Sequence, residues 1–335
     1  MEPQENAQSI SADEIALYDR QIRLWGVQAQ EKIRSANILL ITAKALANEV
    51  AKNLVLAGIG SLTIIDHQDV TEEDLGAQFF VAEAQNEGDV IGKNRAEVAG
   101  PQIRKMNPRV KLNIDTSDVK TKQPEFFAQF DITIATELDF VTNTTINAAC
   151  RLANKPFYAA GLHGFYGYAF ADLISHDFVI ERSKSNLNAG TQETQTRSIV
   201  SKSTKTENDK VIELVTKREV YSPSSSRTPR PSQKNTLVFR AGANKSPHSS
   251  ANLGSELSPV AAFLGGSLAQ DVINVLSARE QPLQNILLFD GEKMVGPIYP
   301  LHPFFPEDLA GAEMGAVPPV RNPVTVPVTG VVDLE

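Results

Sequence analysis

The chain has one cysteine, and acidic residues outnumber basic ones. Its 335 residues include 32 Lys and Arg against 40 Asp and Glu, which gives a formal net charge of −8. This balance argues against a nucleic-acid binder that is held by phosphate contacts. The single cysteine, Cys150, excludes an intramolecular disulfide framework and a multi-cysteine zinc site, and it fits a reducing compartment.

Long uninterrupted apolar runs are also missing. The longest apolar stretch, residues 257–276, is broken by polar residues and a proline, which favours a buried helix over a membrane span. The first residues, MEPQENAQSISADE, are polar and acidic, unlike a signal or transit peptide. We therefore expect a soluble intracellular protein with one large or two ordinary domains.

Glycine is absent at the one turn where the surrounding pattern calls for it. The apolar run 37–41 is typical of a buried parallel strand, and an amphipathic stretch and a second strand at 62–65 follow it. Such a Rossmann-like unit normally carries G-x-G-x-x-G at its first turn, so that bare backbone can approach phosphate. Here the turn 42–47 reads TAKALA. The sequence thus predicts the fold without tight ATP binding at this turn.

Strand-like and helix-like segments alternate up to about residue 180. The expected helices are 13–35, with Ser11 as a possible N-cap, 93–106 and 141–153. The expected strands are 110–115, 131–135 and 156–160, and the aromatic run 165–173 suits paired strands lying over the sheet. The alternation predicts an α/β fold with a doubly wound, mostly parallel Rossmann-like sheet covered by helices.

Composition divides the chain into a folded body and polar segments. The body is expected at 13–182 and again at 253–305. Between them, residues 183–252 are dominated by Ser, Thr, Asn, Gln, Lys and Pro, which predicts a polar, partly disordered insertion. Two apolar islands in the insertion, at 211–215 and 236–239, could pair as strands. Residues 1–12 and 306–335 are expected to be disordered.

Five segments, in the same order along the chain, resemble those of the ubiquitin-like-modifier activating enzymes, a family of ThiF/MoeB-type adenylating proteins. They are YDRQIRLWG at 18–26, GAQFF at 76–80, IGKNRAEVA at 91–99, SPVAAFLGGSLAQDVINVLS at 258–277 and LLFDG at 287–291. The length, the single adenylation-type domain and the degenerate loop resemble the smaller, non-thiol subunits of SUMO-activating enzymes. Such subunits act as heterodimers with a larger catalytic partner.

The resemblance implies that this chain has no working nucleotide site. Active members use a glycine-rich loop, a ribose-binding acid, a lysine and a metal-binding Asp in an Asp-Asn pair. Here Arg95 stands at the position of the lysine, and the pair reads Asp139-Phe140. Asp66 remains at the end of the second strand, where a ribose acid would lie. The resemblance therefore implies no cofactor and no metal in this chain, with Mg-ATP bound by the partner subunit.

Arg20 is the residue to which the resemblance assigns a catalytic role. In the family, the arginine of this signature reaches in trans into the partner's ATP site. A planar, permanently charged guanidinium suits phosphate oxygens, because it can bind them bidentately. The alternative is that Arg20 pairs with Asp19 or Glu14 on a solvated helix face. Arg23 is expected to be structural, and Trp25 to be a core or interface anchor.

Three further groups favour ordinary structural roles. Cys150 falls in a predicted buried helix, so it is expected in the core, and the thioester-forming cysteine on the partner. His163, flanked by glycines at a strand end, fits a structural turn. Basic residues in the insertion could form a weak nuclear-localisation signal, or simply belong to a solvated linker that can be phosphorylated. They are Lys217, Arg218, Arg227, Arg230 and Lys234.

The function implied is that of a non-thiol subunit of a heterodimeric SUMO-activating enzyme. The pair would adenylate the C-terminal glycine of SUMO and transfer it to a cysteine of the larger subunit, indirectly serving the SUMO-conjugating enzyme. We expect location in the nucleus and also the cytoplasm, with no nucleic-acid or membrane partner. Three alternatives remain: a stand-alone MoeB/ThiF-like adenylating enzyme, the smaller subunit of the Nedd-type activating enzyme, and a non-catalytic scaffold with the same fold.

Overall fold

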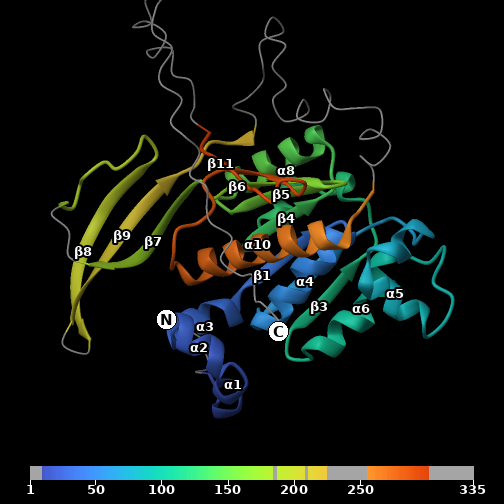
Figure 1. Ribbon diagram of the computed structural model, residues 1–335. Coiled ribbons are helices and arrows are strands. Elements are labelled where there is room, and N and C mark those ends of the chain that lie inside the picture. The colour runs from blue at the N-terminus through green and yellow to red at the C-terminus, as the bar shows by residue number, and fades with distance from the viewer. Residues whose placement is uncertain (1–9, 184–186, 208–209, 225–254, 302–335) are drawn as a thin grey trace, which may run out of the picture.

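A computed structural model describes residues 10–183, 187–207, 210–224 and 255–301 (Figure 1). Within these residues an eight-stranded sheet has the order β11-β10-β6-β5-β4-β1-β2-β3. Its strands β1 to β5 run parallel, and the chain moves outward from β1 in both directions, as in doubly wound folds. These strands are β1 (Asn37–Ile41), β2 (Ser61–Ile65), β3 (Lys111–Asp115), β4 (Ile132–Thr136) and β5 (Phe157–His163). The predicted Rossmann-like, mostly parallel sheet is confirmed.

The other side of the sheet is antiparallel and corrects one prediction. Strand β6 (Tyr166–Asp172) pairs with β5 and with β10 (Ile286–Asp290), so it extends the sheet rather than lying over it. The physical reason is the tight β5–β6 connection. His163 pairs directly with Tyr166, and Gly164 between them takes a φ of 62°, which keeps β6 in the plane of the sheet. The short β11 (Ile298–Tyr299) forms the edge.

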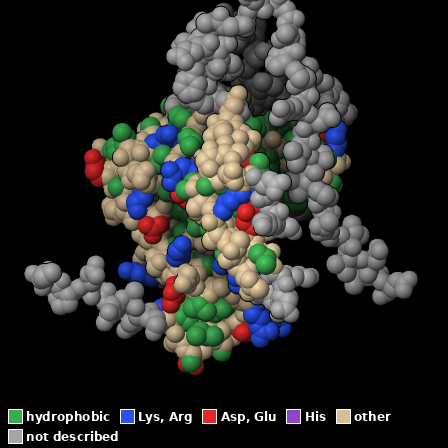
Figure 2. Space-filling model, turned by 90° about the vertical axis from the view of Figure 1, so that its left-hand side faces the viewer, with side chains coloured by type: hydrophobic (Ala, Val, Ile, Leu, Met, Phe, Trp, Pro, Cys, Tyr) green, Lys and Arg blue, Asp and Glu red, His purple; other side chains and the backbone are tan. Residues whose placement is uncertain are grey.

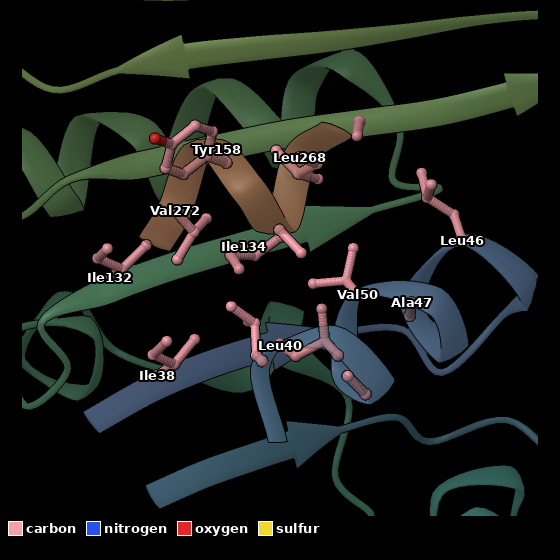
Figure 3. Close-up of a cluster of buried hydrophobic side chains, with 14 of the residues drawn as sticks. Ile38, Leu40, Leu46, Ala47, Val50, Ile132, Ile134, Tyr158, Leu268 and Val272 are labelled. Atoms are coloured by element: carbon pink, nitrogen blue, oxygen red, sulfur yellow. The ribbon is translucent and has the colours of Figure 1, made fainter. Parts of the chain in front are cut away.

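Helices cover both faces of the main sheet (Figure 1). Alternate strand residues enter different clusters: Ile38 and Leu40 face one core, while Leu39 and Ile41 face the other. The first core contains residues of α4 (Ala45–Ala57), α6 (Arg95–Met106) and α10 (Ser258–Ser277), and the second contains residues of α7 (Pro124–Phe127) and α8 (Phe140–Leu152). Figure 3 shows side chains of β1, β4, α4 and α10 meeting in the first core. Short helices η1 (Glu73–Gly76), α5 (Phe79–Gln85) and η2 (Val119–Thr121) fill the connections.

Helix α10 is the long apolar segment of the sequence, and it lies in the core. By length and composition alone it could cross a membrane. In the fold, however, Leu264, Leu268 and Val272 are buried, and the helix packs along α4. The two helices approach so closely that a Cβ on Gly265 would lie 2.6 Å from the Cβ of Glu49. The predicted buried helix is confirmed.

The single N-terminal helix expected over 13–35 is wrong, because the chain bends twice. The structure has α1 (Ala12–Leu17), α2 (Asp19–Trp25) and α3 (Val27–Ser35). The first break is at Tyr18, whose buried hydroxyl accepts a hydrogen bond from Asn107 Nδ2 at 2.8 Å. The second is at Gly26, where φ is 88°, a conformation that favours glycine. The expected Ser11 cap is present, with a reciprocal bond to Glu14.

A second sheet joins the end of the expected body to the first part of the polar segment, where the sequence indicated a mostly flexible insertion. Strands β7 (Ser175–Ser183), β9 (Lys210–Val220) and β8 (Arg197–Glu207) are antiparallel in that order. The apolar island 211–215 lies in β9, whereas the island at 236–239 lies outside the described residues. Charged side chains here bind one another rather than solvent: Arg182 Nε lies 3.0 Å from Glu213, and Lys217 Nζ lies 2.6 Å from Glu193. A segment of polar composition, residues 197–220, therefore supplies two strands of an ordered sheet.

Candidate functional site

The carboxyl ends of β1 and β2 meet the N-terminus of α4, which is where a Rossmann-like fold places a phosphate. The connecting turn closes without glycine, and Thr42 takes a φ of 70°, an uncommon conformation for a β-branched residue. The next amide, Ala43 N, donates to Asp66 Oδ2 at 2.8 Å. A backbone N–H that could face a phosphate is thus already bound to a carboxylate.

Arg95 neutralises the acid that was expected at the ribose position. It reaches from the first turn of α6 and is buried, with Nε 2.8 Å from Asp66 Oδ2 and Nη1 3.4 Å from Asp74 Oδ1. Its Nη2 donates to Gln68 Oε1 at 2.8 Å. The other oxygen of Asp66 accepts the Gln68 amide at 3.0 Å. Both oxygens of Asp66 are therefore engaged inside the protein, and a buried pair of this kind depends on both members staying in place.

A third carboxylate lies at the N-terminus of α4. Ala45 N donates to Glu256 Oε1 at 3.3 Å, and Gln78 Nε2 donates to Glu256 Oε2 at 3.2 Å. Sequence reasoning missed Glu256, which is 211 residues from Ala45 along the chain. The sequence offers one indication, an acid just before a long helix. This pattern is equally consistent with Glu256 stabilising the N-terminus of its own helix, α10. Beneath the turn, the cavity lined by Asn48 and by apolar residues that include Ala43 and Ala47 measures about 10 Å³, the space of roughly one water.

The two acids that follow β4 have different environments. Glu137, at a φ of 55°, accepts the Leu162 amide at 2.7 Å. Burial raises the pKa of Glu137 to about 7, with a further contribution from the charge of Glu256. Asp139 is exposed and caps α8 by accepting from Thr142 N at 2.9 Å. Hydrogen bonds from Thr142 lower the pKa of Asp139 to about 2. In this structure Asp139 is a helix cap, and Asp66 is a member of a buried ion pair.

Arg20 lies on the exposed surface of α2. Among the described residues no hydrogen bond or ion pair involves its side chain. The partners that could have bound it are occupied: Asp19 pairs with Arg23 at 2.9 Å, and Glu14 pairs with Arg34 at 3.1 Å. Among the described residues, Arg20 therefore does not form the solvated ion pair that was the alternative to its catalytic role. Arg23 does form such a pair, with Asp19.

Apolar side chains surround Arg20 in sequence and on neighbouring helices. Leu17 is 58% exposed and Leu24 is 78% exposed. We define the N-terminal apolar surface by its exposed members, which are Ile15, Leu17, Leu24, Val27 and Leu56. Figure 2 shows hydrophobic side chains gathered at the lower end of the molecule, over the N-terminal helices, with acidic and basic side chains around them. Clustered exposed apolar residues with a polar rim are typical of a protein interface.

A groove of about 260 Å³ adjoins this surface, between α2, α4 and α10. It is lined by Gln21, Trp25, Asn53, Leu56, Ala57, Gly266, Gln270 and Ile273. Trp25 is half-buried at its wall, and its indole N–H donates to Gln30 Oε1 at 2.9 Å. Gln30 in turn donates to the Ala57 carbonyl at 3.0 Å. Trp25 is thus an anchor that fixes α2 and α3 to α4, in agreement with the structural role expected for it.

Residues 18–307 match the model of the ThiF family. The chain belongs to the ThiF family. The match covers the sheet, the closed turn and Arg20 together. It includes the segments that carried the resemblance to the ubiquitin-like-modifier activating enzymes, which is confirmed.

Curated relatives of this ThiF-family chain align over nearly their whole length. The chain is 37% identical to "DNA damage tolerance protein rad31" of Schizosaccharomyces pombe, over 88% of this chain and 99% of the relative. It is 35% identical to "DNA damage tolerance protein RHC31" of Saccharomyces cerevisiae, over 87% and 98%. To human "SUMO-activating enzyme subunit 1" it is 32% identical, over 90% and 99%.

The remaining candidates have structural roles in this ThiF fold. Cys150 is buried, and burial raises the pKa of its thiol to about 12, so it is protonated in the core, as expected. His163 stacks on Tyr168, with ring centroids 6.4 Å apart. In the part of the chain that the structure describes, no group of three or more His, Cys, Asp or Glu side chains could hold a metal ion. Lys217 and Arg218 are ion-paired in β9, and the other basic residues of the insertion lie outside the described ranges.

Proposed function

We propose that this chain is the non-thiol subunit of a heterodimeric SUMO-activating enzyme. Membership of the ThiF family implies ATP-dependent adenylation as the chemistry of the assembly. Similarity to human SUMO-activating enzyme subunit 1 over 90% of the chain supports the smaller-subunit role. The observation that carries the proposal is a contrast: the phosphate-facing edge is filled by the protein's own side chains, while Arg20 is exposed and unpaired among the described residues.

The larger subunit would bind Mg-ATP and supply the chemistry of two steps. A carboxylate oxygen of the SUMO C-terminal glycine attacks the α-phosphorus of ATP, the bond to the β-phosphate oxygen breaks, and pyrophosphate leaves. The partner's cysteine thiolate then attacks the acyl carbonyl, and AMP leaves as the thioester forms. Negative charge on the phosphate oxygens must be stabilised in the first step. Arg20 of this chain would do so in trans, since a guanidinium can donate two parallel hydrogen bonds to phosphate.

The N-terminal apolar surface is the natural contact for that partner. Arg20 and Leu24 lie four residues apart on α2 and therefore share a face of that helix, so burying this surface against the larger subunit would bring the guanidinium toward the partner's nucleotide. Removal of water around the arginine would also strengthen its interaction with phosphate. The assembly would serve a SUMO-conjugating enzyme indirectly, and we place it in the nucleus and also the cytoplasm. Direct binding of nucleic acid is not part of the proposal.

Two of the alternatives are less well supported by the geometry. A stand-alone MoeB/ThiF-like enzyme would need a nucleotide at the edge where Arg95 and Glu256 now bind. A pure scaffold would give no reason for an exposed arginine, without a partner among the described residues, on the helix that also carries the exposed Leu24. The smaller subunit of the Nedd-type activating enzyme is a longer protein, whereas SUMO-activating enzyme subunit 1 aligns over 99% of its own length, which supports the SUMO assembly.

The test is ATP–pyrophosphate exchange with SUMO, for this chain alone and with the larger subunit. We expect no exchange alone and exchange when paired. Arg20→Ala should reduce the paired rate by about 10³–10⁵-fold, by analogy with arginines supplied in trans to phosphoryl groups. Arg23→Ala is the matched control, because it lies one turn away and is already paired with Asp19. Exchange by the chain alone, or full activity of Arg20→Ala in an intact complex, would refute the proposal.

A further inference from the structure

The position of Arg20 depends on what holds α2 to the rest of the fold. Helix α2 has seven residues, and it is separated from α1 and α3 by the bends at Tyr18 and Gly26. Isolated helices shorter than about 12–15 residues are marginal in water, so α2 must be stabilised by tertiary contacts. In Figure 1, α1 and α2 lie at the lower end of the molecule, away from the main sheet.

The C-terminal end of α4 provides these contacts. The last carbonyls of a helix have no partner within it, and here side-chain amides from outside α4 donate to three consecutive ones. They are Asn107 to the Val55 carbonyl at 2.9 Å, Gln21 to Leu56 at 3.4 Å and Gln30 to Ala57 at 3.0 Å. Gln21 belongs to α2 itself, and Gln30 accepts the indole N–H of Trp25 at the end of α2. The end of α4 is therefore the base on which α2 rests.

Tyr18 joins the start of α2 to this base by its hydroxyl and by its ring. The hydroxyl accepts from Asn107 Nδ2 at 2.8 Å, and the same amide donates to the Val55 carbonyl. The ring lies against Gly58, where φ is 80° and where a Cβ would come within 2.5 Å of Cζ and the hydroxyl oxygen of Tyr18. Only bare backbone leaves room for the ring at this position. Tyr18 is 7% exposed, so both contacts are shielded from water.

The backbone of Tyr18 transmits this fixed position to the first turn of α2. Its carbonyl accepts from Ile22 N at 2.8 Å, which is the first hydrogen bond of the helix. Arg20 is two residues further along and has no side-chain partner among the described residues. The Asp19–Arg23 pair lies within α2, so it does not attach the helix to the body. The start of the helix therefore sets where the guanidinium of Arg20 can reach.

We propose that Tyr18 is a positioning residue for Arg20. This inference rests on the proposed function, in which Arg20 acts on a nucleotide held by the larger subunit. Tyr18 is buried and acts through Arg20: anchored to Asn107 and Gly58, it holds the first turn of α2 in the orientation that directs the guanidinium at the phosphate. Misplacing a group by about 1 Å can cost on the order of 10²-fold in rate, so the loss of one anchor should slow the reaction without preventing assembly.

The experiment measures ATP–pyrophosphate exchange by the heterodimer with SUMO, in a double-mutant cycle of Tyr18→Phe, Arg20→Ala and the two together. Tyr18→Phe keeps the ring against Gly58 and removes only the hydroxyl. We expect it to lower kcat about tenfold and to leave the KM for ATP unchanged, because Arg20 is needed in the transition state. In the Arg20→Ala background the same change should have no further effect, since Tyr18 acts through Arg20. Tyr299→Phe, at an exposed tyrosine of β11, is the matched control and should leave kcat unchanged.

A kcat of Tyr18→Phe equal to that of the wild type would overturn the inference. Equal reductions of kcat with and without Arg20 would also overturn it, because they would indicate a purely structural role. If Tyr18→Phe does not fold, Asn107→Ser removes the same hydrogen bond from the other side and enters the same cycle, with the same results expected. Full exchange by Arg20→Ala would refute the proposed function itself, whereas a large loss with Arg20→Ala and none with Tyr18→Phe would refute only the positioning role.

Discussion

Arg95 and Arg20 are the same kind of side chain in opposite situations. The Arg95 side chain is 3% exposed, with three described partners that include Asp66 and Asp74. Arg20 is exposed and has no described partner. A buried arginine that is bound on all sides stabilises the fold but cannot stabilise charge on a ligand. An exposed arginine within an apolar surface contributes little to the fold, yet it is free to act on a partner's substrate.

The comparison predicts first that Arg95 is the arginine on which stability depends. Arg95→Ala would leave two buried carboxylates, Asp66 and Asp74, without their cation. Breaking a buried pair in this way costs about 3–5 kcal/mol. Chemical denaturation should show the loss, whereas Arg104→Ala, at an exposed position of the same helix, should change the unfolding free energy by less than about 0.5 kcal/mol. Similar values for the two variants would contradict the assignment of Arg95.

The pH dependence of the unfolding free energy tests the buried environment of Glu137, next to the closed edge. The pKa of Glu137 is raised from 4.5 to about 7, so between these values the folded state holds a proton that the unfolded state has lost. Stability from this group is present at low pH and falls as the pH rises through about 7, by roughly 2–3 kcal/mol after allowing for partial solvent access.

Glu137→Gln should therefore flatten the curve of unfolding free energy against pH between about 4.5 and 7. Asp271 also has a raised pKa, about 6, because it is buried, and it contributes a slope of the same sign at lower pH. The difference between wild type and variant isolates Glu137. Parallel curves for the two proteins would mean that Glu137 is ionised in the folded state throughout this range.

The smallest predicted effect concerns the N-terminal apolar surface. Leu24→Asp should weaken binding to the larger subunit by about 1–2 kcal/mol and leave the stability of the isolated chain unchanged, because Leu24 is 78% exposed. Leu152→Asp is the control: Leu152 is 87% exposed, at the C-terminal end of α8 on the other side of the sheet. Titration calorimetry with the partner would measure both. Equal weakening by both variants would show that the interface does not centre on the N-terminal helices.

Much of the fold could be predicted because its information is local. The apolar runs of β1, β2 and β4 and the capping pair of Ser11 and Glu14 each occupy a few consecutive residues. The break at Tyr18 could not be predicted in this way, since it depends on a hydrogen bond to Asn107. Of the β7–β9–β8 sheet only the apolar island 211–215, in β9, was predicted as a possible strand. The rest was missed, because its charged residues look solvated until cross-strand ion pairs such as Arg182–Glu213 are seen.

In the candidate site, too, features encoded by consecutive residues could be predicted, and contacts between distant residues could not. The missing glycines of the turn and the arginine at position 95 could be read directly from the sequence, and they predicted a degenerate nucleotide edge. How that edge closes could not be read, because Asp66, Arg95 and Glu256 come from distant parts of the chain. The role of Arg20 in trans stays a prediction; the structure adds that Asp19 and Glu14, the partners considered for it, pair with Arg23 and Arg34.

The stoichiometry of Mg-ATP binding tests the contrast between the closed edge and the exposed arginine most directly. Equilibrium dialysis with labelled ATP would be carried out on the isolated chain and on its complex with the larger subunit. Our account predicts no binding to the isolated chain and one ATP per heterodimer. Binding to the isolated chain, or two ATP molecules per heterodimer, would show that the edge closed by Arg95 and Glu256 still opens to nucleotide, and would contradict it.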